Sequence, residues 1–509
     1  MGHDVEDPRR QEESKATDQK DEVHATQNDL AETTPSRPYS AFTAGQKKGI
    51  VALVAFAGWF SSLSSFIYFP AIPFIATDLG VSIEKINLTV TAYLIASGLF
   101  PALVGEAADT IGRRPVLIVT LSLYVAANIG LALQSSFGLL FFLRIVQSAG
   151  ISGSYAVTYG VVGDLFTPAE RGGYSGVVSF VLNTPPSIGP IISGLLMTRW
   201  GWRAIFWFLS AISPLCLILV ICFLPETSRR LVGDGSVLPK RTNRPLVSFL
   251  LPKQQCEEAL VPIPTSRAFY FPNPLKPLIL LKRPNTAIVV GSVGVWYTVY
   301  SCLQASLSSL FAQVYQVSGL VSGLTYIPFG VACAISAFGT GKILDIDYRL
   351  TAAKYGVSAE NRKAQDLDNF PIEEARIRSL TYSLLVCGLL IVGYGWLLQR
   401  QVHITAPLVF QFFIGLTIQG VFTALSTLLV DIHPNASSTA QAASNFVRAE
   451  LAAAGLALLD PILRGIGAGW AFVLFGVLGL LSIPWLYLLQ IKGLQWRQSY
   501  RDMAAEGQS

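Results

Sequence analysis

Three charged residues lie well inside long apolar segments of the chain, where a charge is costly and therefore informative. They are Arg144, Arg448 and Glu450. An arginine within a membrane span costs about 2.5–3.5 kcal/mol on insertion scales unless it faces a polar cavity. We expect Arg144 to face such a cavity, with Gln147 one turn later on the same helix face. The alternative is that its side chain extends to the outer interface of the membrane.

Glu450 is the acidic residue placed deepest in any apolar segment, because the other acidic residues near these segments fall at their ends. A carboxyl group near the membrane midplane can carry a proton, which makes Glu450 a candidate for proton coupling. An ion pair that fixes helix contacts is an equally good interpretation. Asn445 and Arg448 share one helix face, whereas Glu450, two positions on, points elsewhere.

Aromatic and hydrogen-bonding residues in other apolar segments would line the same central cavity. Aromatic rings with scattered polar groups suit a bulky, amphipathic organic molecule. Each of these residues could instead serve helix packing. The candidates for the substrate cavity are Tyr68, Trp296, Tyr300 and Gln304.

A tight, charged turn separates the second and third apolar segments, from Gly105 to Arg114. Its glycines permit a close helix approach and a sharp backbone bend. Asp109 can pair with Arg113 or Arg114, or accept hydrogen bonds from helix N-terminal amides of a neighbouring bundle. Such contacts can close one conformer of a carrier and release in the other; an ordinary charged hairpin is the alternative. The predicted gate residues are Gly105, Asp109, Gly112, Arg113 and Arg114, with Gly341 and Asp345 at the same spacing in the turn after the eighth segment.

The fifth apolar segment is rich in proline and glycine. Prolines interrupt the hydrogen bonds of a helix, and small residues let helices approach closely. We therefore expect a bent, closely packed helix that acts as a hinge or a helix crossing, an inert kink being the alternative. The hinge residues are Pro185, Gly189, Pro190 and Gly194.

Membrane-spanning helices must position these residues. The 509-residue chain is 51% hydrophobic and only 14% charged, whereas soluble domains are roughly a quarter charged. Twelve segments reach the roughly 20 apolar residues that a helix needs to cross a bilayer. In lipid, only helices and closed barrels satisfy the backbone, and these segments are too long for barrel strands. The sequence therefore predicts an all-α membrane protein, with spans at 49–76, 87–107, 115–134, 137–162, 172–197, 203–224, 286–313, 319–343, 378–399, 405–430, 440–463 and 469–491.

Matching features in the two halves of the chain predict two pseudo-symmetric six-helix bundles with a substrate site between them. A dense series of prolines between the halves favours a tether over a packed domain. The predicted parts are a disordered cytosolic tail (1–48), a first bundle (49–224), a cytoplasmic linker (225–285), a second bundle (286–491) and a cytosolic tail (492–509).

Lysine and arginine are unevenly distributed between the two sides of the predicted membrane. Most of the 37 basic residues fall in the tails and in the loops that share their side. Because basic loops stay in the cytoplasm, both termini are predicted to be cytoplasmic. We expect a multi-pass protein of the plasma membrane.

Several other classes of protein are disfavoured. The sequence has no basic stripe interleaved with aromatic residues outside the membrane, as a nucleic-acid interface would need. It has no nucleophile–base pair, no metal-ligand spacing and no phosphate-binding loop. We therefore expect neither an enzyme nor a metal, cofactor or nucleic-acid partner.

The chain resembles the major facilitator superfamily, and within it the fungal twelve-span drug:proton antiporters. Gly105 to Arg114 is similar to the superfamily's signature between spans 2 and 3. Leu143 to Gly150 resembles the span 4 signature, whose arginine is assigned to proton coupling. Gly189 to Gly194 resembles the antiporter signature of span 5, with Ser193 where the family usually has glycine. Leu224-Pro225-Glu226-Thr227 is also similar to this branch, and the resemblance covers residues 45 to 495.

The resemblance implies a secondary transporter with alternating access. We expect an exporter of a small amphipathic organic molecule, such as a drug, toxin or secondary metabolite, driven by proton antiport through Arg144 and Glu450. Its partners would be the substrate, protons and membrane lipid, and we expect a monomer. An exporter of organic acids such as citrate or itaconate is one alternative, with Arg144 and Arg448 binding carboxylates. A non-transporting membrane sensor is another, disfavoured because the tails contain no recognisable signalling domain.

Overall fold

The computed structural model describes residues 39–166, 184–237, 243–249, 276–317, 319–356, 370–433 and 437–506, together with residue 239 and a few single positions between 166 and 184. Within these ranges every regular element is a helix and no strand occurs. Ten of the described helices are long and apolar enough to cross a membrane. The predicted all-α membrane fold is therefore confirmed.

The difference between twelve predicted spans and ten counted helices has two causes. The predicted span 172–197 runs through positions outside the described residues, and its described part, α8 (Pro185–Trp200), has only 16 residues. The last two predicted spans are counted as one, because α17 (Ser437–Leu480) continues through the residues between them and α18 (Ser482–Glu506) follows almost directly. Gly467 interrupts α17 with a φ of 77° and a ψ of 166°, a backbone conformation that favours glycine.

The first bundle contains the helices from α2 to α9, and side-chain caps fix where several of them begin. Thr43 caps α2 in a reciprocal arrangement with Gln46, Ser82 caps α4, and Ser136 caps α6. The elements are α2 (Ala44–Phe66), η1 (Phe69–Ala71), α3 (Ile72–Asp78), α4 (Ile83–Thr110), α5 (Arg113–Leu133), α6 (Phe137–Leu165), α8 and α9 (Arg203–Phe223), followed by the short α10 (Arg229–Val232) and η3 (Leu246–Phe249).

The second bundle contains the helices from α11 to α18. Two of them, α11 and α13, have proline in the first turn, where the missing N–H removes no helical hydrogen bond. The elements are η4 (Lys276–Lys282), α11 (Pro284–Tyr315), α12 (Gly319–Leu324), α13 (Ile327–Lys354), α14 (Ile372–Ile377), α15 (Leu380–Gln399), α16 (Thr405–Ile432), α17 and α18.

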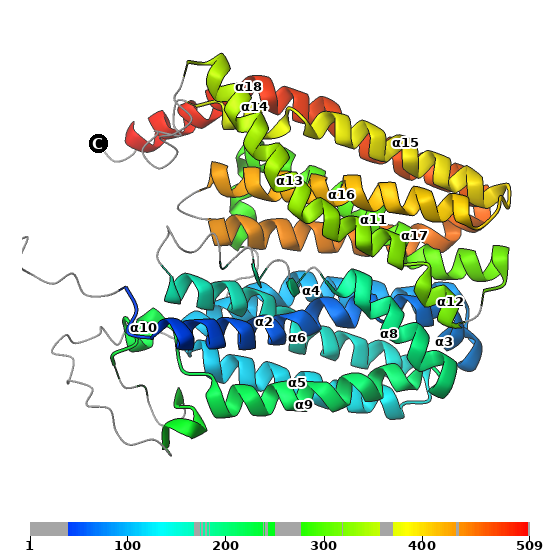
Figure 1. Cartoon of the computed structure of the whole chain (residues 1–509), viewed down its shortest axis with the longest axis horizontal. Helices are drawn as coiled ribbons and strands as arrows, with labels where there is room; N and C mark the ends of the chain where they lie inside the picture. Colours follow the sequence, from blue (N-terminus) through cyan, green and yellow to red (C-terminus); the bar gives the residue numbers. More distant parts are fainter. Residues whose placement is uncertain are drawn as a thin grey trace, which may run out of the picture.

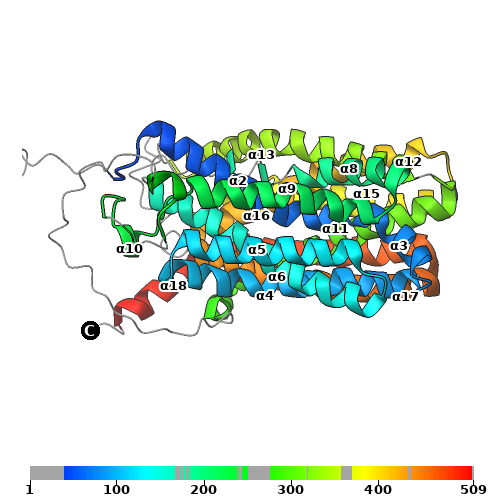
Figure 2. The ribbon, with the colours of Figure 1, turned by 90° about the horizontal axis from the view of Figure 1, so that it is seen from below.

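The long helices of both bundles run along one axis, and the bundles lie side by side (Figure 1). The start of α2, the end of α18 and α10 lie at one end, which we call the termini end; α3 and α12 lie at the opposite end (Figures 1 and 2). The bundles contact each other along two seams, between α4 and α17 and between α8 and α12. Any relative motion of the bundles must change these seams.

The bundles touch closely at the opposite end. The hydroxyl of Ser308 in α11 donates to the carbonyl oxygen of Pro70 at 3.2 Å. Gly323 in α12 packs so closely on α8 that a Cβ there would lie 2.5 Å from the carbonyl oxygen of Pro190. The opposite end is therefore closed in this conformation.

Two helices extend far past their predicted ends. α13 continues to Lys354, beyond the predicted end at 343, and α18 continues to Glu506, beyond 491. Hydropathy marks only the apolar part of a helix, and polar turns that continue it need other support. For α13 that support includes α14 and the two residues before it, as in the ring contact between Tyr348 and Phe370 at 5.0 Å. Gly341 and Asp345 consequently lie inside a helix, and the prediction that they occupy a turn is wrong.

The described start of the predicted linker packs on the first bundle. The backbone N–H of Ala41 donates to the carbonyl oxygen of Asp234 at 2.9 Å, and the Nδ2 of Asn243 donates to that of Ile111 at 3.4 Å. The central part of the predicted tether, 250–275, and most of the predicted tail, 1–38, lie outside the described residues.

Candidate functional site

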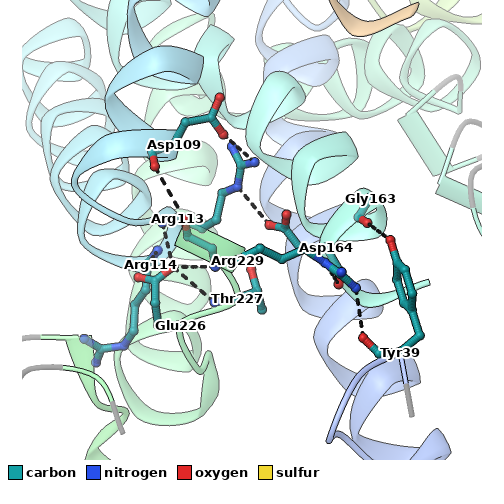
Figure 3. Close-up of polar contacts among 10 residues, drawn as sticks. Tyr39, Asp109, Arg113, Arg114, Gly163, Asp164, Glu226, Thr227 and Arg229 are labelled. Carbon is teal, nitrogen blue, oxygen red and sulfur yellow. Dashed lines mark hydrogen bonds and ion pairs between the residues drawn. The ribbon is translucent and has the colours of Figure 1, made fainter. Parts of the chain in front are cut away.

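The charged turn between α4 and α5 forms a compact ion-pair cluster at the termini end (Figure 3). Nη2 of Arg113 lies 2.6 Å from Oδ1 of Asp109, and its Nε lies 3.1 Å from Oδ2 of Asp164 near the end of α6. The side chains of Arg113 and Asp164 are largely buried, whereas Asp109 is half-exposed. One guanidinium group thus joins the ends of three helices.

Gly112 provides the sharp bend that the sequence predicts. Its φ of 121° lies in the region that residues with side chains rarely adopt. A Cβ at this position would also lie 2.4 Å from Oε2 of Glu226. Gly105 is less constrained, because its Cβ would make only an ordinary contact with Ala156, at 3.7 Å.

Glu226 is a residue of this cluster to which the sequence analysis assigned no role. Its carboxylate accepts hydrogen bonds from the backbone N–H groups of Arg113 at 2.8 Å and Arg114 at 3.3 Å, where α5 begins. It also accepts from the N–H groups of Thr227 and Ser228, at 3.1 and 3.0 Å, and is only 2% exposed. A carboxylate at a helix N-terminus satisfies free amides and is stabilised by the helix dipole. The signals in the sequence were its position directly after the last span of the first bundle and the resemblance of Leu224-Pro225-Glu226-Thr227 to the family.

Arg229 extends the cluster to the segment before α2. Its Nε donates to the carbonyl oxygen of Asp164 at 3.0 Å and its Nη2 to that of Tyr39 at 2.9 Å (Figure 3). The hydroxyl of Tyr39 donates in turn to the carbonyl oxygen of Gly163 at 3.3 Å. These partners belong to the first bundle and its flanking segments, so the cluster fixes one bundle internally in this conformation.

Arg114, which the sequence offers as a second partner for Asp109, has another contact. Its Nη2 donates to the carbonyl oxygen of Ile221 in α9 at 2.8 Å. The described ion pair of Asp109 is with Arg113. A contact between Asp109 and the second bundle stays a prediction for another conformation.

The second bundle carries a comparable cluster at the same end. The carboxylate of Asp347 in α13 accepts from the N–H of Ser379 at 3.2 Å and from its hydroxyl at 2.8 Å, just before α15. Nε of Arg376 lies 2.8 Å from Oδ2 of Asp431 near the end of α16. Acidic side chains thus bind the starts and ends of helices in both bundles.

This second cluster is centred on Asp347, and not on the predicted pair Gly341 and Asp345. Asp347 is buried, whereas Asp345 is exposed. A Cβ on Gly341 would meet no atom within 4 Å, so this glycine allows no close helix approach here. The equal spacing in sequence was misleading, because α13 continues through both positions as a helix.

Arg144 is fully buried in the first bundle. Its Nη1 donates to Oε1 of Gln147 at 2.6 Å and to the carbonyl oxygen of Ser64 at 3.4 Å. The guanidinium lies 4.2 Å from the ring centroids of both Tyr68 and Tyr93, a cation–π arrangement. Its Nε and Nη2 are buried without a hydrogen-bond partner. Gln147 lies on the same helix face as predicted, and the two side chains form a hydrogen bond. Aromatic rings cover the arginine, which does not face an open cavity in this conformation.

The seam between α4 and α17 contains Asn445, Arg448 and Glu450. Nδ2 of Asn445 donates to the carbonyl oxygen of Ser97 in α4 at 3.3 Å, and its Oδ1 accepts from Nε of Arg448 at 3.1 Å. A Cβ on Gly98 would lie only 3.0 Å from Oε1 of Glu450. That oxygen is buried and has no hydrogen-bond partner. The carboxylate therefore faces the other bundle, and the alternative of an ion pair is not observed among the described residues.

Arg448 borders an aromatic cluster between the bundles. Its guanidinium lies 4.8 Å from the ring centroid of Tyr297, which contacts Tyr300 at 5.7 Å and Phe422 at 6.0 Å. Tyr300 also contacts Phe66 of the first bundle, with ring centroids 6.1 Å apart. The predicted combination of aromatic rings and a polar group is thus present around Tyr300 and Arg448.

Three other predicted cavity residues are fully buried within the bundles. Nε1 of Trp296 donates to the hydroxyl of Ser482 at 2.9 Å, and its ring occupies the space beside Gly479. The hydroxyl of Tyr68 hydrogen-bonds to that of Thr89 at 2.9 Å. Gln304 has no exposed surface either. In this conformation Trp296 and Tyr68 pack within the bundles, whereas the side-chain oxygen and nitrogen of Gln304 are buried without a hydrogen-bond partner. Cavity lining by these residues in another conformation stays a prediction.

The described part of the proline-rich fifth span packs as closely as predicted. A Cβ on Gly189 would lie 3.1 Å from the backbone nitrogen of Ile67 in the segment after α2. A Cβ on Gly323 of α12 would lie 3.0 Å from Cα of Gly194. α8 begins at Pro185 and continues through Pro190. Close helix crossing is therefore observed, and the hinge motion stays a prediction.

Comparison with known proteins agrees with this architecture. The sequence model of the Major Facilitator Superfamily matches residues 54–456. The solved structure of the human organic anion transporter MFSD10 (TETRAN) is similar, with a TM-score of 0.56, 17% identity and coverage of 86% of this chain and 99% of that one. At this identity the likeness concerns the fold alone.

Curated relatives are similar over nearly the whole chain. An MFS-type transporter, phiD, of a fungal species is 37% identical, over 91% of this chain and 71% of the relative. The MFS-type transporter tstD of Talaromyces stipitatus is 35% identical over 94% and 88%, and citrate exporter 1 of Aspergillus niger is 32% identical over 92% and 90%. These matches support a multi-pass membrane transporter of small molecules, and the chain belongs to the major facilitator superfamily, beside MFS-type transporters of fungi.

Proposed function

We propose that this protein is a secondary active exporter that moves a small amphipathic organic molecule out of the cell in exchange for protons. Relatives named as MFS-type transporters support the general activity. Two bundles that meet along α4–α17 and α8–α12 suit a carrier that opens alternately to each side. The aromatic cluster around Tyr300 and Arg448 suits an amphipathic cargo.

The observation that carries the proposed proton coupling is the position of Glu450. Its Oε1 is buried against Gly98 of the other bundle and has no hydrogen-bond partner. Burying an ionised carboxylate without a partner is costly, so closure of this seam favours the neutral acid. When the seam separates, water can solvate the carboxylate, and the proton is released. The protonation state of Glu450 is thereby linked to the position of the bundles.

The closed opposite end gives this linkage a direction. With both termini in the cytoplasm of a plasma-membrane protein, the opposite end faces outward. Closure of that end carries the protonated Glu450 into the inward-facing form. Separation of the seam on the cytoplasmic side of Glu450, with the opposite end still closed, then lets the proton leave toward the cytoplasm before the cargo loads, and the loaded carrier opens outward. This order of events is an antiport cycle.

Arg144 is the second proposed participant in coupling. It is a fully buried cation with two unpartnered donor atoms, held between the rings of Tyr68 and Tyr93. A buried charge without a counter-ion raises the free energy of the conformation that contains it. Movement of the two rings would let water or a polar group of the cargo reach Arg144, which favours the other conformer.

The ion-pair cluster around Arg113 is proposed to act as the gate at the termini end. In the described conformation Asp109 is half-exposed and pairs within its own bundle. When the termini end closes, this carboxylate could meet the second bundle and stabilise the outward-facing form. The contacts of Asp109 with the second bundle would then form as the opposite end opens.

Transport by the purified full-length chain in proteoliposomes tests the proposal. Rhodamine 6G serves as an amphipathic cargo probe, with a pH gradient imposed across the membrane. We expect the dye to accumulate on the acidic side against its own gradient, and the accumulation to collapse when nigericin removes the pH gradient. Dye movement that only follows the dye's own gradient and is unaffected by nigericin would contradict antiport and leave a facilitator.

Export of an organic acid is the second candidate, favoured by Arg448. This half-buried arginine forms no ion pair with a described carboxylate and borders the aromatic cluster. One relative is named as a citrate exporter. If the cargo is anionic, Arg448→Gln should abolish transport of radiolabelled citrate and spare that of rhodamine 6G. Loss of both, or of neither, would remove this candidate.

A further inference from the structure

A second acidic residue, Asp460, lies in the seam between α4 and α17, closer to the opposite end than Glu450. Successive contacts along the seam place it there. The carbonyl oxygen of Ala453 accepts from the hydroxyl of Thr91 at 3.4 Å. One carboxylate oxygen of Asp460, Oδ2, lies 3.3 Å from Nδ2 of Asn87 in the other bundle. Asn87 and Asp460 therefore meet only when the opposite end is closed.

The amide of Asn87 has an unsatisfied atom. Asn87 is 3% exposed and Asp460 is 9% exposed, so water contributes little to either side chain. Nδ2 of Asn87 donates to Asp460, but its Oδ1 is buried with no hydrogen-bond partner. An ionised carboxylate has only acceptor atoms and cannot satisfy a carbonyl oxygen. Leaving a buried acceptor unsatisfied is unfavourable, and a neutral carboxylic acid, which has a donor, would remove the defect.

The charged surroundings of Asp460 do not replace that missing donor. Two charged groups lie near its carboxyl, Arg464 one turn later on α17 and Glu84 on α4. The arginine favours the ionised form of Asp460 and the glutamate favours the neutral form, so the two effects oppose each other. Arg464 is exposed and forms no ion pair with Asp460. α11 and α15, which also pack against α17, contain no Asp, Glu, Lys, Arg or His within Pro284–Tyr315 and Leu380–Gln399. Asn87 is thus the direct hydrogen-bonding partner of this carboxyl among the described residues.

We propose that Asp460 and Asn87 form a proton-binding site that holds the opposite end closed. In the closed form the neutral carboxyl group of Asp460 donates its O–H to Oδ1 of Asn87 and accepts from Nδ2. The two side chains then make a reciprocal pair of hydrogen bonds across the bundles. When the opposite end opens, Asp460 meets water, loses its proton to the solution on that side, and the pair separates.

This site differs in its task from Glu450. The inference rests on the proposed function in one respect, namely that the bundles alternate between two conformations. The proton on Asp460 is taken from and returned to the same side of the membrane, so it is not transported. It makes closure of the opposite end easier when the solution on that side is more acidic. Closing the opposite end returns the carrier to its inward-facing form. In a proton-driven exporter, the rate of this return therefore rises with the same acidity that drives transport.

The distance between the bundles at the opposite end tests this inference without any cargo. Spin labels are attached at Ser135→Cys in the first bundle and Val402→Cys in the second, both exposed between helices. The full-length chain, with its six native cysteines replaced, is placed in lipid nanodiscs and measured by pulsed electron paramagnetic resonance across a series of pH values. Each proton linked to closure raises the ratio of closed to open molecules up to about tenfold per unit decrease in pH, so with Glu450 and Asp460 both linked we expect a rise of up to about a hundredfold.

Variants of the pair identify the group that titrates. Asp460→Asn can form the two reciprocal hydrogen bonds at every pH, so we expect a more fully closed opposite end that keeps only the pH dependence contributed by Glu450. The exchanged pair, Asn87→Asp with Asp460→Asn, again contains one acid and one amide, and we expect the full pH dependence to return. Return of the dependence would also show that the exchanged chain folds. Asp78→Asn is the matched control, because Asp78 lies at the same end but is half-exposed and paired with Arg203; it should behave as the wild type.

Three results would overturn the inference. They are a wild-type distance that is independent of pH, an unchanged pH dependence in Asp460→Asn, and a loss of the dependence in Glu450→Gln but not in Asp460→Asn. The last result would assign the linked proton to Glu450 and leave the proposed antiport intact. Conversely, dye transport without proton coupling in proteoliposomes would contradict antiport but would not affect the spin-label result.

Discussion

The charged clusters at the termini end and the seam between α4 and α17 both contain buried acidic side chains. These side chains have hydrogen-bonding or ionic partners in the clusters, and they lack such partners wholly or in part in the seam. At the termini end, acidic side chains have partners: Glu226 binds four backbone amides, and Asp164 lies beside Arg113. In the seam, Glu450 has an unpartnered oxygen, and Asp460 has only an amide whose own oxygen is unsatisfied. The first arrangement stabilises one fixed structure. The second arrangement contains buried atoms that lack hydrogen-bond partners, which suits the proposal that these parts bind protons and separate during a cycle.

The largest change in stability is expected for Glu226→Ala at the termini end. The substitution leaves the buried amides at the start of α5 and after α9 without an acceptor, which should lower the free energy of unfolding by about 2–4 kcal/mol. A fall in the midpoint of thermal unfolding in detergent would show it. Glu106→Ala, which removes a carboxylate from the last turns of α4 without a described hydrogen bond, is the control. Equal midpoints for both variants would contradict the assigned role of Glu226.

A smaller effect, on conformation, is expected for Gly323→Ala in the seam between α8 and α12. The new Cβ would lie 2.5 Å from a backbone oxygen that cannot move aside easily. We expect closure of the opposite end to be disfavoured by about 1–3 kcal/mol. The closed fraction between labels at Ser135 and Val402 should fall accordingly. Gly341→Ala, where the Cβ meets no atom within 4 Å, should leave this fraction unchanged; the same shift in both variants would contradict the argument.

The smallest effect is expected for Asp109→Asn. Its ion pair with Arg113 is short, but the side chain of Asp109 is 45% exposed and the pair lies one turn apart at a surface. Such pairs contribute only about 0.3–0.5 kcal/mol, and salt weakens them. Thermal unfolding should therefore be almost unaffected in this conformation. A loss of stability as large as that of Glu226→Ala would mean that Asp109 has structural partners beyond those described.

The sequence predicted the parts of this comparison that depend on local pattern. Span-length apolar runs gave the helices, and glycine in a tight turn gave the bend at Gly112, whose φ is positive. The contact between Arg144 and Gln147 follows from helical spacing, because residues three apart share a face. These are properties of neighbouring residues, and they do not require knowledge of how the bundles pack.

Contacts between distant residues could not be predicted in this way. Glu226 binds the backbone of Arg113 from 113 positions away, and nothing in the intervening sequence indicates it. Asn87 and Asp460 are separated by 373 positions and meet only because the bundles close on each other. Gly341 and Asp345 repeat the spacing of Gly105 and Asp109, and the prediction that they also lie in a turn was wrong for a related reason. The position at which α13 ends depends on its packing with α14, and hydropathy carries no information about that.

Proton-driven transport by Glu450→Gln tests the central claim of this account most directly. The variant and the wild type are compared in proteoliposomes by two assays, accumulation of rhodamine 6G under an imposed pH gradient and exchange of labelled for unlabelled dye without a gradient. Glutamine mimics the protonated acid, so the account predicts that exchange is retained while gradient-driven accumulation falls to background. Accumulation by Glu450→Gln that still follows the pH gradient as in the wild type would contradict it.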